Sequence, residues 1–179
     1  MTHTLKITVH SCKDLDDVES MGKNDPYVQF SCDVTNNDVF KKHKTTTKKN
    51  AGKSPEFNET ISLESFNPTE HHELYVEVLE ADVGMDPPIG YCMIPLSQVT
   101  NSENHVLKGC FDLFTPSGKT KGTIHLTIAI VTPGQASPAC HATEIKGLSQ
   151  KTTDQEKRIK AMKTNEKVGD AATAAAILG

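Results

Sequence analysis

Apolar and polar residues alternate in several short runs of this chain, and this alternation limits its fold more than any other feature. A period of two is typical of a β-strand that buries one face. Clusters of Gly, Pro, Asn and Asp separate the runs, and no long amphipathic helix interrupts them before residue 140. The pattern predicts an all-β sandwich rather than alternating strands and helices. The apolar positions of the clearest runs are Leu5, Ile7 and Val9; Leu74, Val76 and Val78; and Ile124, Leu126, Ile128 and Ile130.

Five carboxylates lie on two polar loops, and each loop precedes a run that reads as buried strand. Carboxylates that face one another repel, so a cation between them is expected. Ca²⁺ takes about six to eight oxygen ligands from carboxylates and carbonyls, which two such loops could supply. The pattern therefore predicts a calcium clamp; the alternative is a pair of polar loops that bind nothing specific. The five residues are Glu19, Asp25, Glu80, Asp82 and Asp86.

Four motifs resemble those of the C2 domain family, a family of calcium- and phospholipid-binding β-sandwiches, and they stand in the same order. The resemblance covers about residues 3–132. It implies an eight-stranded antiparallel β-sandwich with a strand order similar to the type II permutation, followed by a disordered or helical C-terminal tail. The motifs are Leu5-Lys-Ile-Thr-Val-His-Ser-Cys-Lys-Asp-Leu15 with Gly22-Lys-Asn-Asp-Pro-Tyr-Val28, then Ser54-Pro-Glu-Phe-Asn-Glu59, then Leu74-Tyr-Val-Glu-Val-Leu-Glu-Ala-Asp82, and Ile89-Gly90 with Ile94-Pro-Leu96.

The resemblance also assigns roles to the acids. Asp25 and Asp82 match ligand positions of the family, whereas Glu19 and Glu80 stand where calcium-binding members usually have Asp. Glu is one methylene longer, which displaces its carboxylate by about 1.5 Å and would weaken the site. Asp86 lies in a loop one residue shorter than the common spacing, and we expect it to be a ligand.

Apolar side chains stand beside the acids on the same two loops. Met21, Val83 and Met85 are expected to insert into a lipid surface. Burial of one such side chain would contribute about 1.5–3 kcal/mol, enough to supplement a calcium bridge to lipid but not to replace it. The alternative is that Met21 and Val83 fold back against the loops.

A lysine-rich stretch at residues 41–49 is a second candidate for lipid binding. Its alternation predicts a strand with Lys42, Lys44 and Lys48 on one face. In the family that it resembles, a lysine-rich strand at this place can bind phosphoinositide head groups, and each Lys could add about 1 kcal/mol. The alternative is an exposed strand whose lysines maintain solubility. No aromatic residues interleave with the lysines, so nucleic acid is not expected as a partner.

Charge and composition divide the chain into a body and a tail. Residues 1–133 carry 12 Lys and Arg against 18 Asp and Glu, and the remainder carries 7 against 5. An acidic body repels nucleic acid and anionic lipid at long range, so local patches must do any binding. The composition predicts a C2-like domain over 1–133, a linker over 134–150 and a helical or disordered tail over 151–179.

Other features narrow the function further. No signal peptide or membrane span is visible, so we expect a cytoplasmic, peripheral membrane protein. Five cysteines without paired spacing favour reduced thiols over disulfides or a zinc site, with Cys12 and Cys110 as core residues. No catalytic motif is present, so an enzyme is not expected.

These observations favour calcium-dependent binding of anionic phospholipid membranes by a single membrane-targeting domain. The alternative is a calcium-independent module with a degenerate calcium site, which binds phosphoinositide, or a protein partner through the tail.

Overall fold

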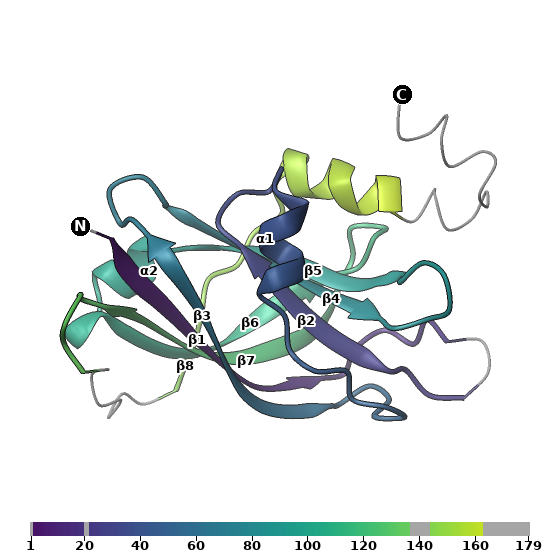
Figure 1. Ribbon diagram of the computed structural model, residues 1–179. Helices are drawn as coiled ribbons and strands as arrows, with labels where there is room; N and C mark the ends of the chain where they lie inside the picture. The colour runs from purple at the N-terminus through teal and green to yellow at the C-terminus, as the bar shows by residue number, and fades with distance from the viewer. Residues whose placement is uncertain (1, 20–21, 137–143, 163–179) are drawn as a thin grey trace.

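The computed structural model describes residues 2–19, 22–136 and 144–162 (Figure 1). The strands are accompanied by two short helices, α1 (Asn37–Lys42) and α2 (Ser97–Thr100), by a 3₁₀ turn (Glu103–His105) and by a last helix over 153–162. The strands are β1 (His3–Lys13), β2 (Pro26–Ser31), β3 (Glu56–Phe66), β4 (Glu73–Glu80), β5 (Pro88–Pro95), β6 (Val106–Phe114), β7 (Thr120–Val131) and β8 (Ile145–Lys146).

The strands form one curled sheet in the order β2-β4-β5-β6-β7-β1-β3, with every neighbouring pair antiparallel. A single residue pair, Tyr91 with Phe114, links β5 to β6. The sheet turns there into two facing layers, β2-β4-β5 and β6-β7-β1-β3. The short β8 adds to β6 in parallel. The predicted all-β antiparallel sandwich is confirmed.

The core lies between the two layers and contains the residues that the alternation placed there. Leu5, Ile7 and Val9 have no exposed surface, and the apolar positions of β4 and of β7 are buried with them. In β7 the neighbours on the other face, such as His125 and Thr127, are only half-buried. The alternation was therefore a correct guide to which face of β1 and β7 packs inward.

The outer face of β4 is buried as well, which alternation alone does not predict. Tyr75, Glu77 and Leu79 are all buried. The helix over 153–162 lies beside α1 above this layer (Figure 1). Its Ile159 has no exposed surface, and its Gln155 donates a hydrogen bond from Nε2 to the carbonyl oxygen of Val76 at 3.1 Å. The last helix therefore covers β4.

The strand predicted over the lysine-rich stretch is wrong: α1 ends only at Lys42, and beyond it Lys44 forms no more than an isolated bridge with Gln29. The side chain of Asn36 caps this helix and accepts a hydrogen bond from the Val39 backbone N–H at 3.1 Å. Residues from His43 onward are extended and run along β2, where Thr45 donates to the Val28 carbonyl at 2.8 Å. Lys42 therefore does not share a strand face with Lys44 and Lys48.

Residues 144–152, which we call the strap, run along the β5 and β6 strands. Gln150 and Met93 exchange two backbone hydrogen bonds, of 2.8 and 2.9 Å. Gly147 donates from its backbone to the Cys110 carbonyl at 2.8 Å, and a Cβ at Gly147 would fall 2.2 Å from the Phe111 ring. The strap thus packs tightly on the sandwich. None of the described helices has the length and apolar character needed to span a bilayer.

Candidate functional site

The two acidic loops lie at the same end of the sandwich, on the right in Figure 1. The first loop, residues 14–25, leads into β2, and the third loop, residues 81–87, follows β4. These two strands pair directly, with Pro26 opposite Glu80. The backbone N–H of Asp25 donates to Oε2 of Glu80 at 2.7 Å, and the N–H of Ala81 donates to the Asp25 carbonyl at 3.0 Å. The pairing therefore brings Asp25 and Glu80 together. We call residues 14–25 and 81–87, with Glu80, the rim.

Glu80 is the most deeply buried of the five predicted ligands. Only 1% of it is exposed, and its Oε1 is buried without a hydrogen-bond partner. Burial raises the pKa of Glu80 to about 7; the charges of Asp25 and Glu19 and a side-chain contact with Glu19 act in the same direction, against the hydrogen bond from the Asp25 backbone. Three carboxyl groups from both loops therefore converge where one buried oxygen has no donor. A bound cation would supply the missing partner.

The aspartates of the rim hold the loops in shape. Asp86 Oδ2 accepts a hydrogen bond from the Tyr27 hydroxyl at 2.6 Å, and its Oδ1 accepts from the Asp82 backbone N–H at 2.9 Å. Asp82 Oδ1 accepts from the Val83 N–H at 2.7 Å. Asp25 Oδ1 accepts from the Asn50 N–H at 2.6 Å. Each aspartate thus uses at least one oxygen for a local bond.

The five predicted ligands are consequently near one another without forming a closed shell. Within residues 2–19, 22–136 and 144–162, no three rim carboxylates have ligand atoms that all lie within 4.8 Å of one another. Calcium binding by this rim would require the side chains to move inward. Ca²⁺ tolerates varied geometry and takes backbone carbonyls and water as ligands, so the donor set fits this cation.

The apolar residues of the third loop point into solvent. Val83 is 100% exposed and Met85 is 37% exposed. Val83 therefore does not fold back against the loop. Gly84 between them has φ +100, a left-handed conformation that suits glycine and turns the loop at its tip. Met21, the third predicted insertion residue, lies outside the described residues.

The lysines are not equivalent. Lys42 and Lys44 are exposed, and the Lys44 ammonium lies 5.5 Å from the centroid of the Tyr27 ring. Lys48 is half-buried, and its Nζ lies 3.3 Å from Oε2 of Glu59. The pairing reduces the charge that Lys48 could offer to a lipid head group.

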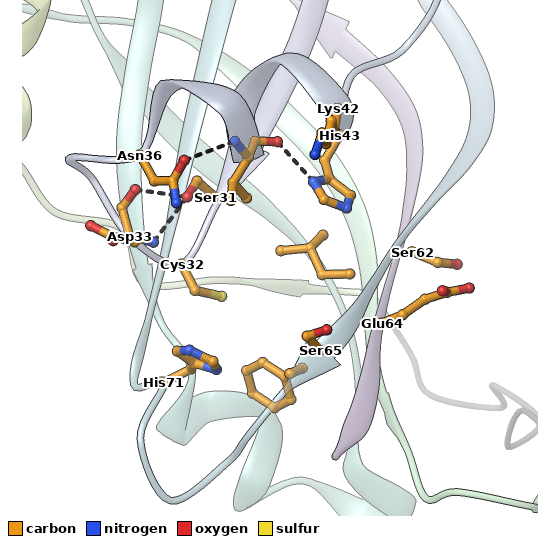
Figure 2. A pocket seen from close by; sticks show the side chains of 13 residues that line it. Ser31, Cys32, Asp33, Asn36, Lys42, His43, Ser62, Glu64, Ser65 and His71 are labelled. Atoms are coloured by element: carbon orange, nitrogen blue, oxygen red, sulfur yellow. Dashed lines mark hydrogen bonds between the residues drawn. The ribbon is translucent and has the colours of Figure 1, made fainter.

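A pocket of about 490 Å³ lies between α1 and the end of β3, and none of the five acids lines it (Figure 2). Burial raises the pKa of the Cys32 thiol in its wall to about 12, so this thiol is protonated at neutral pH. His43, also in the wall, places Nδ1 2.8 Å from the Val39 carbonyl oxygen. The Cys32 thiol is therefore not an activated nucleophile.

One group of potential metal ligands was not predicted from the sequence. Cys110, His125 and Glu144 come together on the β6–β7 surface. Cys110 is half-buried and not the core residue that was predicted, whereas Cys12 is buried. Spacings of 15 and 19 residues match no ligand motif, and only the register of β6 against β7 reveals the group.

The fold and the rim define a small β-sandwich with acidic loops at one end. The model of the C2 domain family matches residues 3–113, more than half of the chain. The chain belongs to the C2 domain family, whose fold typically serves as a binding module without catalytic activity.

Two curated relatives from Arabidopsis thaliana resemble this chain. The 16 kDa phloem protein 2 is 32% identical over 97 residues, which is 54% of this chain and 60% of that protein. Protein SRC2 homolog is 27% identical over 161 residues, which is 85% of this chain and 48% of that protein. The chain therefore spans about half to three fifths of the length of these relatives.

Solved structures agree on the fold. A single C2 domain of plant Extended Synaptotagmin 1 has a TM-score of 0.61 at 19% identity and is covered to 98%, with 75% of this chain aligned. The calcium-bound tandem C2 domains of Extended-Synaptotagmin 2 have a TM-score of 0.58 at 26% identity, over 73% of this chain and 46% of that one.

Proposed function

We propose that this chain is a cytoplasmic, peripheral membrane-targeting module that binds anionic phospholipid in a calcium-dependent manner through the rim. The observation that carries the proposal is the buried Oε1 of Glu80, which has no hydrogen-bond donor and faces the region of Glu19 and Asp25. An uncompensated buried carboxylate beside two more is costly without a cation. The residues that would hold Ca²⁺ are Glu19, Asp25, Glu80, Asp82 and Asp86.

Ca²⁺ would supply a positive charge with ligand positions open to lipid phosphate. The chain itself orders the loops that present the acids, through the bonds of Asp25 to Asn50 and of Asp86 to Tyr27. It also places exposed Val83 and Met85 beside those acids, where they can enter the lipid surface while the acids stay at its edge. Together with Met21, these side chains form the proposed insertion set.

Family membership supports the proposal, since C2 domains as a class bind lipid membranes. One similar structure, the tandem C2 domains of Extended-Synaptotagmin 2, is calcium-bound.

A second binding mode uses the lysines. Lys42 and Lys44 are exposed, so a phosphoinositide head group could reach them without calcium, whereas Lys48 is engaged by Glu59. This mode involves a different surface from the rim and could operate together with it.

Sedimentation with liposomes distinguishes the two modes. With phosphatidylserine vesicles, we expect the full chain to pellet in calcium and to stay in the supernatant in chelator. Asp82→Asn should remove the calcium response, whereas Lys42→Ala with Lys44→Ala should preserve it. Binding to phosphoinositide vesicles in chelator, lost in the lysine variant and weakened by salt, would indicate the second mode. A protein that stays in the supernatant under every condition would contradict both, and the tail would then be examined for a protein partner.

A further inference from the structure

Cys110, His125 and Glu144 bring a thiol, an imidazole and a carboxylate to one point on the outer surface of the β6–β7 layer. Their ligand atoms all lie within 4.8 Å of one another, and within the described part of the chain no other set of three meets this criterion. Cys110 and His125 are direct cross-strand partners, so two of the three side chains stand on paired strands. Glu144 arrives from the strap, just before β8 pairs with β6.

The carboxylate of Glu144 lies between the other two groups. The Cys110 thiol donates to its Oε1 at 2.7 Å, and His125 Nε2 lies 3.2 Å from its Oε2. This nitrogen is buried and makes no hydrogen bond. One oxygen of the carboxylate thus faces each partner, and a buried imidazole nitrogen points to the centre of the group without a well-aligned donor or acceptor.

The three atoms suit a transition metal better than calcium. Sulfur, nitrogen and a single carboxylate are the ligands of Zn²⁺, which binds them at about 2.0–2.3 Å in a tetrahedron, so that ligand atoms stand about 3.3–3.8 Å apart. The observed separations need only small movements to reach that spacing. Ca²⁺ and Mg²⁺ select oxygen ligands and would not be held by a thiolate and an imidazole.

We propose that Cys110, His125 and Glu144 form a zinc-type metal site that fastens the strap to the sandwich. The metal takes one ligand from β6, one from β7 and one from the strap, and a water molecule completes the tetrahedron. On binding, the thiol loses its proton to solvent and the metal replaces the thiol–carboxylate hydrogen bond. This site is independent of the calcium site proposed for the rim.

The surroundings keep the imidazole in place. The ring of His10 packs against the ring of His125 at a tilt of 37°, with centroids 4.5 Å apart, and His10 Nε2 lies 2.7 Å from Oγ1 of Thr127. Burial and the hydrogen bond to Glu144 raise the pKa of Cys110 to about 11, against the positive charges of Lys13 and Lys146, so the thiol stays protonated until a metal displaces its proton. His10 therefore supports the ring of His125 and is not one of the three ligands.

Cobalt substitution tests the site on the full chain, with excess calcium present to occupy any site made only of oxygen ligands. A Co²⁺–thiolate bond produces a charge-transfer absorption in the near ultraviolet. We expect this band in the natural protein and its loss in Cys110→Ser. Added Zn²⁺ should displace the Co²⁺ and so remove the band. Glu144→Gln and His125→Gln should each weaken Zn²⁺ binding at least about tenfold in calorimetric titration, the usual order of effect for a ligand or its supporting partner.

Two other cysteine variants are matched controls. Cys32→Ser removes a thiol in the pocket of Figure 2, and Cys140→Ser removes one that lies outside the described residues; both should retain the band. Circular dichroism confirms that each variant is folded before it is scored. A natural protein with no cobalt–thiolate band, or a band that survives Cys110→Ser and disappears in Cys140→Ser, would overturn the assignment.

Discussion

Arg158 Nε donates a hydrogen bond to Oε2 of Glu77 at 2.9 Å, and Nη2 of the same guanidinium donates to Oε1 at 3.1 Å. Glu77 has no exposed surface, and its Oε1 also accepts from Gln29 Nε2 at 2.9 Å. The guanidinium carbon of Arg158 lies 4.2 Å from the centroid of the Phe40 ring. The last helix therefore neutralises a charge that β4 buries, and it joins β4 to β2 and α1.

This ion pair makes the last helix part of the folded domain. We expect Arg158→Ala to lower the free energy of unfolding by about 3–5 kcal/mol, because it leaves the Glu77 carboxylate buried with too few partners. Urea denaturation followed by circular dichroism measures the change. The control is Lys160→Ala, which removes a 2.8 Å pair with Glu156 on the exposed side of the same helix. If Arg158→Ala lowered the free energy of unfolding no more than Lys160→Ala does, the ion pair with Glu77 would contribute little to stability.

Calcium should stabilise the domain if the rim binds it in the folded state only. At one hundred times the dissociation constant, we expect about 2.7 kcal/mol of added stability, seen as a higher melting temperature. Magnesium should do less because it keeps its waters and requires octahedral geometry.

Variants of single acids locate the calcium ligands. Asp25→Asn and Asp82→Asn should abolish or greatly weaken the calcium effect on melting. Asp14→Asn should preserve it, since Asp14 pairs with Lys121 at 2.9 Å on an exposed surface. A loss in Asp14→Asn as large as in Asp82→Asn would place the first-loop ligand elsewhere.

Val83 should contribute to membrane affinity without contributing to calcium affinity. Val83→Ser removes the most exposed large apolar side chain of the described residues. If that side chain enters lipid, its loss should weaken vesicle binding in calcium about tenfold or more, while calorimetric calcium titration in solution stays unchanged. Ile145→Ser, at a 46% exposed position on β8, is the matched control and should bind vesicles as the natural protein does.

The raised pKa of Glu80 predicts how stability depends on pH in chelator. Its ordinary pKa is 4.5, and in the folded protein it is about 7. Between these values the folded state holds more protons than the unfolded state, so this group makes stability fall as pH rises from 4.5 to 7. Glu80→Gln should remove that part of the decline and melt higher than the natural protein above pH 7. Glu64→Gln, at an exposed position on β3, should leave the profile unchanged.

Local pattern was sufficient for the sandwich, and the resemblance to the C2 family implied that the two acidic loops meet. Leu5, Ile7 and Val9 are buried as a period of two requires. Asp25 and Glu80 are in contact because β2 and β4 pair, as the family order implied. Their roles as ligands remain predictions.

Features that depend on the tail or on cross-strand register did not follow from local pattern. Glu77 reads as a solvent-facing strand residue until Arg158 covers it from 81 residues away. Signals for α1 were present in the sequence, namely Asn36 as a cap and Asp38 in the first turn, but lysine alternation from residue 41 obscured them. The group around Cys110 and His125 depends on strand register, which spacing along the chain does not reveal.

The burial of β4 beneath residues 153–162 has a further consequence. The strap and the last helix together resemble a peptide ligand that is covalently tethered to the surface it binds, namely β4, β5 and β6. The tether gives this peptide a high effective concentration at that surface. If a protease cut the chain between Ala136 and Glu144, the hydrogen bonds and packing of the strap and the last helix would still hold the two fragments together. Any outside protein that sought the outer face of β4 would first have to compete with this resident peptide.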